Sequence, residues 1–183
     1  YDLGQSGLHH VITSGDNINI LIVDTAPYTC ETEREQQKKD IGLYAMNYGS
    51  VYVASVAVYA SYTGVLQALM EADAYQGPSI VLAYLPQLYD VPNPLATLKE
   101  TKKSVDTGAW PLYRWNPALE EAAGQDMFSL DSLRIKKSLE AFLAKENYLT
   151  QLISSHPDIS AALVSSLESV SNVTYQILTV ALT

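Results

Sequence analysis

The chain has 183 residues, 48% of them hydrophobic, which fits one domain with a single substantial core. Its net charge of -9 excludes a nucleic-acid surface, which needs a basic patch, and disfavours binding to an anionic membrane. The single cysteine excludes an internal disulfide and fits a reducing compartment, so we expect a cytoplasmic protein.

The first elements alternate between helical and strand-like patterns, which is typical of an α/β fold. Leu8, Val11 and Ile12 share one face of a helix predicted over residues 7–14. Residues 18–23 are nearly all β-branched or leucine, which predicts a strand in a parallel sheet with both of its faces covered.

A helix over residues 41–46 and a second buried strand over 51–58 follow. The apolar stretch 51–70 resembles a membrane span, but its many polar residues favour this strand and a following helix instead. Ser61 or Thr63 is expected to cap that helix. Its inward-facing residues are predicted to be Val65, Leu66, Leu69 and Met70.

The pair Gly77-Pro78 ends this helix, and residues 79–85 form the third strand. A helix over 95–105 is expected to turn its lysines to solvent, and short strands over 112–115 and 127–130 are expected to pair. The rest of the chain reads as helix, over 138–145, 148–155 and 159–178.

These patterns predict one α/β domain over residues 1–183, with a mainly parallel sheet, helices on both faces and a helical C-terminal extension. The α/β core is expected over 1–110, and the extended segment and helices over 111–183. The first strand ends at Asp24-Thr25 and opens into a loop, which is where ligands bind in open α/β sheets.

Segments spread over most of the chain carry a resemblance to a known family. They are residues 1–4, 7–11, 17–25, 38–43, 48–57 and 77–80 and, most distinctively, 106–117. In this order they resemble the thiamine-diphosphate-binding domain of pyruvate:ferredoxin (flavodoxin) oxidoreductases. The resemblance implies a thiamine-diphosphate-binding fold that holds the coenzyme and Mg²⁺ for oxidative decarboxylation of a 2-oxo acid.

The same resemblance implies that the metal site is incomplete. In the family, a Gly-Asp-Gly element with a metal-binding Asp precedes the residues that match Tyr1. Thr25 matches a metal-binding threonine, and the carbonyl of Pro27 falls where a backbone ligand would be. Since Mg²⁺ requires near-octahedral oxygen coordination, these two groups alone are not expected to hold it.

The loop that contacts the coenzyme also departs from the family pattern. Where the family has Tyr-Ser-Asn-Thr-Gly-Gly-Gln, residues 28–34 read Tyr-Thr-Cys-Glu-Thr-Glu-Arg, so Cys30 replaces the asparagine. Glu31 and Glu33 would repel a diphosphate, and both glycines are missing. We therefore expect a vestigial cofactor site at Thr25, Pro27 and Cys30, with no catalytic residue and no metal ligand set.

Such a degenerate module is expected in the beta chain of fungal NADPH-dependent sulfite reductases, whose N-terminal part resembles pyruvate:ferredoxin oxidoreductase. The chain, which begins at Tyr1 without a leader, then reads as a non-catalytic structural and assembly domain cut from a longer oxidoreductase. Sirohaem, iron-sulfur and flavin groups would lie elsewhere in that parent. The expected partners are other domains of the same chain, a flavoprotein subunit and a second copy in a homodimer.

Two alternatives stay open. The chain is either a working thiamine-diphosphate domain of a 2-oxo acid oxidoreductase with altered ligands, or a free-standing domain that binds another ligand at the strand ends.

Several other residues that could have a function have simpler structural interpretations. We expect one of His9 and His10 to pack and the other to face water, Arg114 to be a structural residue stacked on aromatic rings, and Cys30 not to be a reactive thiol. Tyr59, Tyr62 and Tyr89 are candidates for subunit packing.

Overall fold

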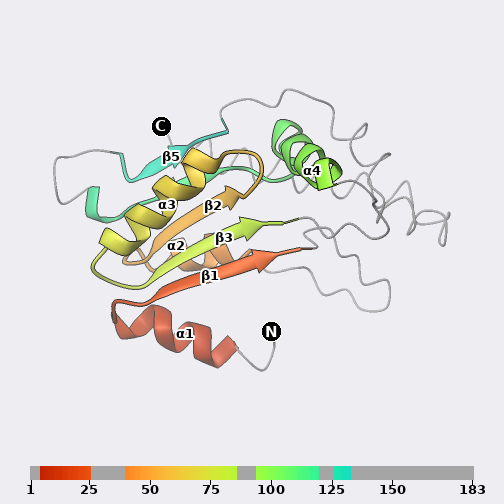
Figure 1. Cartoon of the computed structure of the whole chain (residues 1–183). Coiled ribbons are helices and arrows are strands. Elements are labelled where there is room, and N and C mark those ends of the chain that lie inside the picture. Colours follow the sequence, from red (N-terminus) through yellow and green to blue (C-terminus); the bar gives the residue numbers. More distant parts are fainter. Residues whose placement is uncertain (1–4, 26–39, 86–93, 120–125, 133–183) are drawn as a thin grey trace.

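The computed structural model describes residues 5–25, 40–85, 94–119 and 126–132. Its centre is a five-stranded sheet in the order β1-β3-β2-β4-β5 (Figure 1). The strands are β1 (Asn19–Asp24), β2 (Tyr52–Ala57), β3 (Ser79–Tyr84), β4 (Tyr113–Trp115) and β5 (Phe128–Leu130). The first three run parallel to one another, while β4 and β5 are antiparallel additions beside β2. This mixed, mostly parallel sheet confirms the α/β class, and β4 and β5 pair as the sequence predicts.

Two short helices cover one face of the sheet. They are α1 (Gln5–Ser14) and α2 (Ile41–Met46). Ile12 and Ala45 from these helices pack with Val53, Ile80 and Tyr113 of the sheet in one apolar cluster. This cluster is the larger part of the core. The side chain of Asp40 accepts a hydrogen bond from the Leu43 amide and so fixes the start of α2.

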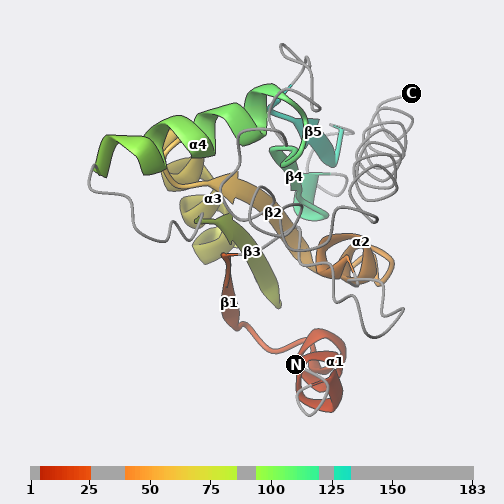
Figure 2. The ribbon, with the colours of Figure 1, turned by 90° about the vertical axis from the view of Figure 1, so that its right-hand side faces the viewer.

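The opposite face is covered by α3 (Tyr62–Ala74), which lies across from α2 in Figure 2. Ser61 is its cap, because its hydroxyl accepts a hydrogen bond from the Gly64 amide. The small side chains of Ala68 and Ala72 face the sheet and pack on Ala54 and Val81. Helices on both faces are therefore confirmed for the described part of the chain.

The predicted inward face of α3 is only partly right. Val65 packs against the sheet, but Leu66, Leu69 and Met70 are exposed. The prediction assigned the most hydrophobic side chains of the helix to the inward face. In the structure the alanines face the sheet instead, because their small side chains let the helix lie close to the strands.

The expectation that β1 is covered on both faces is wrong. In the described sheet β1 is an edge strand, and its side chains alternate between exposed and partly buried. Ile20 and Ile22 pack into the core, whereas Leu21 and Val23 are exposed. The physical reason is that α3 packs on β2 and β3, so the described helices leave this face of β1 exposed (Figure 1).

The last helix of the described part is α4 (Pro94–Asp106), which lies near the carboxyl end of β2 (Figure 1). Gly108 follows it with a φ of 75°, a left-handed conformation that glycine adopts without strain. Lys99 and Lys102 are exposed, and Lys103 pairs with Glu100. None of the described helices is long and apolar enough to cross a membrane. The helices predicted after residue 137 lie outside the described residues.

Candidate functional site

The carboxyl end of β1 holds the one candidate site residue that the structure describes. Thr25 directly follows the strand and is exposed to solvent. The carbonyl of Asp24 accepts a hydrogen bond of 3.0 Å from the Leu85 amide, which aligns the ends of β1 and β3. Pro27 and Cys30 lie outside the described residues, so their predicted roles stay predictions.

Aromatic rings pack over the carboxyl ends of the neighbouring strands β2 and β3. Tyr84, the last residue of β3, is buried and stacks on Trp110 with 5.2 Å between the ring centroids. The indole of Trp110 donates a hydrogen bond of 3.1 Å to the carbonyl of Val56 near the end of β2. Ala57 and Leu112 complete this cluster. Among the described residues at this edge of the sheet, the ends of β2 and β3 are packed with apolar and aromatic groups.

The described residues at this edge do not fit a Mg²⁺-diphosphate group. Mg²⁺ takes oxygen ligands in near-octahedral geometry, usually with one or two carboxylates and several waters. Within the residues that the structure describes, no group of three His, Cys, Asp or Glu side chains is placed to hold a metal. Thr25 supplies one hydroxyl on an exposed strand end and the half-buried Asp24 beside it one carboxylate, which are fewer oxygen ligands than the metal and a diphosphate need.

A cluster that the sequence did not predict joins α1 to α2. Nδ1 of His9 lies 3.0 Å from the hydroxyl of Tyr44 and 2.9 Å from that of Tyr48, and the two hydroxyls are 3.0 Å apart. The hydrogen bond with Tyr44 raises the pKa of Tyr48 above its ordinary value. Both His9 and His10 are exposed, but the ring of His9 makes an edge-to-face contact with that of Tyr48, with 5.8 Å between the centroids. We interpret the cluster as a polar bridge between two helices.

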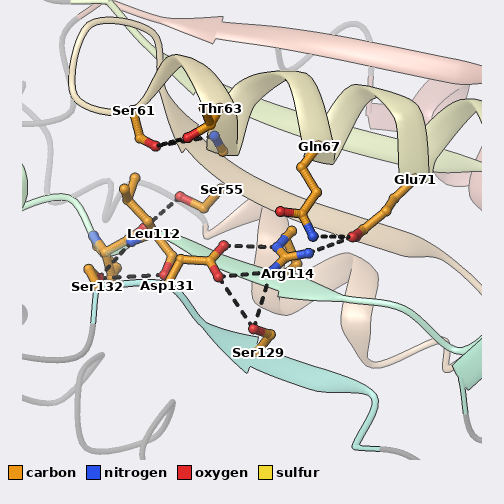
Figure 3. A network of polar contacts seen from close by, with 12 residues as sticks. Ser55, Ser61, Thr63, Gln67, Glu71, Leu112, Arg114, Ser129, Asp131 and Ser132 are labelled. Carbon is orange, nitrogen blue, oxygen red and sulfur yellow. Dashed lines mark hydrogen bonds and ion pairs between the residues drawn. The ribbon is translucent and has the colours of Figure 1, made fainter.

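Arg114 is at the centre of a second polar network (Figure 3). Its guanidinium makes two hydrogen bonds of 2.9 Å to Asp131 after β5 and one of 2.5 Å to Glu71 on α3. Glu71 also accepts a hydrogen bond of 3.0 Å from Tyr52 on β2. The hydrogen bonds to Asp131 and the two carboxylate charges raise the pKa of Arg114, so it stays charged.

The network gives Arg114 a structural role, as expected, but through carboxylates rather than stacked rings. Its bidentate contact with Asp131 and its bond with Glu71 tie the β4–β5 hairpin to α3. The only sequence signal of this structural role was the arginine itself, which lies in a short predicted strand. The acids that pair with it are 43 and 17 residues away along the chain, so sequence spacing could not identify them.

The tyrosines proposed for subunit packing have mixed positions. Tyr59 and Tyr62 form an edge-to-face pair with 6.5 Å between ring centroids, and Tyr62 is exposed. Tyr89 lies outside the described residues. Tyr62 is thus available on the outer surface of α3, next to the exposed leucines of the same helix.

Comparison with known proteins shows similarity to two groups of oxidoreductases. The chain is 54% identical over 168 residues to the "Sulfite reductase [NADPH] subunit beta" of Schizosaccharomyces pombe and 53% identical over 167 residues to that of Saccharomyces cerevisiae. It is 39% identical over 186 residues to the pyruvate:ferredoxin oxidoreductase of Moorella thermoacetica. No protein-family model matches the chain.

These matches cover 91–92% of the chain but only 11–16% of each relative's length. They confirm the resemblance predicted from the sequence, both to pyruvate:ferredoxin oxidoreductases and to fungal sulfite reductase beta chains. The chain therefore corresponds to one segment of these much longer proteins.

Proposed function

We propose that this chain is a non-catalytic structural and assembly domain of a larger cytoplasmic oxidoreductase of the sulfite reductase beta type. The parent would reduce sulfite with electrons from NADPH, received through a flavoprotein partner. Sirohaem, iron-sulfur and flavin groups would be bound by other parts of that assembly. Within it, residues 1–183 would act as a single domain that keeps the α/β scaffold but binds no coenzyme.

The observation that carries this proposal is the chemistry at the carboxyl edge of the sheet. Where a diphosphate and its metal would need several oxygen donors, the described residues at the end of β1 offer the exposed hydroxyl of Thr25 and the carboxylate of Asp24, while the end of β3 is closed by the stack of Tyr84 on Trp110. The loop sequence supports the same conclusion, because Glu31 and Glu33 would add negative charge close to a diphosphate.

The level of similarity supports the choice of parent. Identity to the two fungal sulfite reductase beta chains is 53–54%, against 34–39% for the bacterial pyruvate oxidoreductases that also match. The second group nevertheless favours one alternative function, a working thiamine-diphosphate domain whose altered loop supplies different ligands.

Calorimetric titration with thiamine diphosphate and Mg²⁺ separates these two functions. The titrated protein is the chain extended on its amino-terminal side, so that any upstream metal ligand is present. We expect no binding heat at millimolar coenzyme, the same as in a control titration with Mg²⁺ alone. A Mg²⁺-dependent heat with micromolar affinity would establish the working domain instead.

A further inference from the structure

The outer surface of α3 and the uncovered face of β1 carry a group of exposed apolar side chains. Each of the six is between 43% and 65% exposed. They are Leu21, Val23, Tyr62, Leu66, Leu69 and Met70. We call this group the α3–β1 surface. Scattered exposed leucines are ordinary on a protein, but large side chains gathered on two neighbouring elements indicate a binding surface.

The strand register shows that the two β1 residues lie on the α3 side of the sheet. Leu21 is aligned with Val81 of β3, and Val81 is aligned with Ala54 of β2. Val81 and Ala54 both pack in the cluster that α3 covers. Side chains at aligned positions point to the same face, so Leu21 and Val23 continue this face one strand beyond the helix.

The helix geometry shows that Tyr62, Leu66 and Leu69 are on the side of α3 toward β1. Successive residues rotate by 100°, which places these three about 140–180° around the axis from Glu71, whereas Met70 is on the outer side of the helix, away from the sheet. Glu71 reaches Arg114 on β4, so it marks the side of α3 that faces the β4–β5 hairpin. The leucines are on the other side, above the uncovered strand. The exposed side chains of α3 and those of β1 therefore lie on adjoining surfaces, one on the side of the helix and one on the face of the strand.

The charges on this surface restrict its occupant. The stretches that carry the six side chains, residues 19–23 and 62–70, contain no charged residue, whereas the exposed acids Asp16 and Asp73 lie where β1 begins and α3 ends. The net charge of -9 opposes contact between two copies of the chain. By contrast, 88–89% of each sulfite reductase relative lies outside the matched segment.

We propose that the α3–β1 surface binds an amphipathic helix from another part of the same longer polypeptide, which packs beside α3 and over β1. The face of that helix that meets Leu21, Leu66 and Leu69 is apolar, and a basic residue at its rim lies near Asp16 and Asp73. A helix fits because the apolar stripe along one of its faces can pack on the exposed side chains of α3 and of β1 together. This inference rests on the proposed assembly role and names the surface that performs it.

Site-specific labelling with a maleimide tests the proposal. Leu66→Cys places the thiol in the surface, and Lys99→Cys places a matched thiol at an exposed position of α4. The labelling rate at each site is measured by mass spectrometry in the 183-residue chain and in the full-length polypeptide that carries it. Oxidation of the native Tyr62 ring by hydroxyl radicals gives a second readout without a substitution.

We expect Leu66→Cys to react rapidly in the 183-residue chain and at least ten times more slowly in the full-length polypeptide, with Tyr62 protected in parallel. Lys99→Cys should react at similar rates in both. Equal rates for Leu66→Cys in the two proteins would overturn the proposal. So would protection in the 183-residue chain that disappears on dilution, which identifies a second copy as the occupant.

A strand that pairs with the edge of β1 is also distinguishable from a helix. It would slow amide exchange in β1 of the full-length polypeptide while Leu66→Cys stayed reactive, and that result would overturn the proposal. None of these readouts depends on coenzyme binding. If thiamine diphosphate does bind the chain, the proposed function fails while protection of Leu66→Cys is still measured independently.

Discussion

At position 42, α2 lies so close to β4 that a side chain has no room. A Cβ atom on Gly42 would lie 2.1 Å from the hydroxyl of Tyr113 and 3.1 Å from a methyl group of Leu82. We expect Gly42→Ala to lower the free energy of unfolding by about 1–3 kcal/mol, as overpacking does. Urea unfolding measures this difference.

Gly7→Ala is the matched control, because a Cβ at this position in α1 has no neighbour within 4 Å. It should leave stability unchanged or raise it slightly. Tyr113→Phe removes the atom that clashes, so it should reduce the cost of Gly42→Ala. Equal effects of Gly42→Ala and Gly7→Ala would show that α2 and β4 are not in this close contact.

Two tyrosines make stability fall at high pH. Burial raises the pKa of Tyr113, with a smaller contribution from the charge of Asp40, and burial and the charge of Glu71 raise that of Tyr52. The unfolded chain loses these protons near pH 10, whereas the folded chain retains them. Their contribution is therefore complete below pH 10 and is lost as the pH rises above it, by about 1.4 kcal/mol per pH unit for each group.

Unfolding measured between pH 8 and 11.5 tests this dependence. Tyr113→Phe should decrease the slope above pH 10, since one of the two buried tyrosines with a raised pKa is gone. Tyr62→Phe is the control and should leave the slope unchanged, because Tyr62 is exposed in the folded chain. A slope that is the same in all three proteins would contradict the assigned burial of Tyr113.

Among the elements, α3 gives the clearest test of which face is inward. Ala68 is fully buried against the sheet, and Leu66 is exposed on the outer surface. Ala68→Leu should destabilise the chain by about 1–3 kcal/mol through overpacking, whereas Leu66→Ala should change stability by less than about 0.5 kcal/mol. Thermal or urea unfolding of the 183-residue chain measures both. If Leu66→Ala destabilised the chain more than Ala68→Leu, the inward face predicted from hydropathy would be correct and the face seen in the structure would be wrong.

The elements also show which features the sequence determines locally. The strands β2 and β3, the helix α2 and the β4–β5 pair follow from local patterns, such as the apolar run after Gly77-Pro78 that forms β3. The cap at Asp40 was found only in the structure. The orientation of α3 could not be predicted, because alanines carry little hydrophobic signal yet fill the close contact with the sheet. The strand order, in which β3 lies between β1 and β2, depends on contacts far apart in sequence.

At the candidate site, too, some features were predicted from the sequence and others were not. The sequence places Thr25 at the end of the first strand, and the structure confirms that position. The stack of Tyr84 on Trp110 was not predicted, because these residues are 26 positions apart and their contact depends on how the chain returns after α4. The carboxylate partners of Arg114 were missed for the same reason.

For the whole molecule, the fold is of a ligand-binding type, but the residues described at the strand ends supply few groups that could bind a coenzyme. The sheet and its covering helices form an α/β scaffold of the kind that binds ligands at the carboxyl ends of its strands. The described groups at those ends are the hydroxyl of Thr25, the carboxylate of Asp24 and packed aromatic rings. The large apolar side chains exposed on α3 and β1 suit a role in assembly.

The most direct test is a crystal structure of the chain, extended on its amino-terminal side and grown with millimolar thiamine diphosphate and Mg²⁺. Our account predicts no coenzyme density beside Thr25 and an unchanged stack between Tyr84 and Trp110. Density for the coenzyme at that strand end, with an ordered metal bound by Thr25, would contradict it.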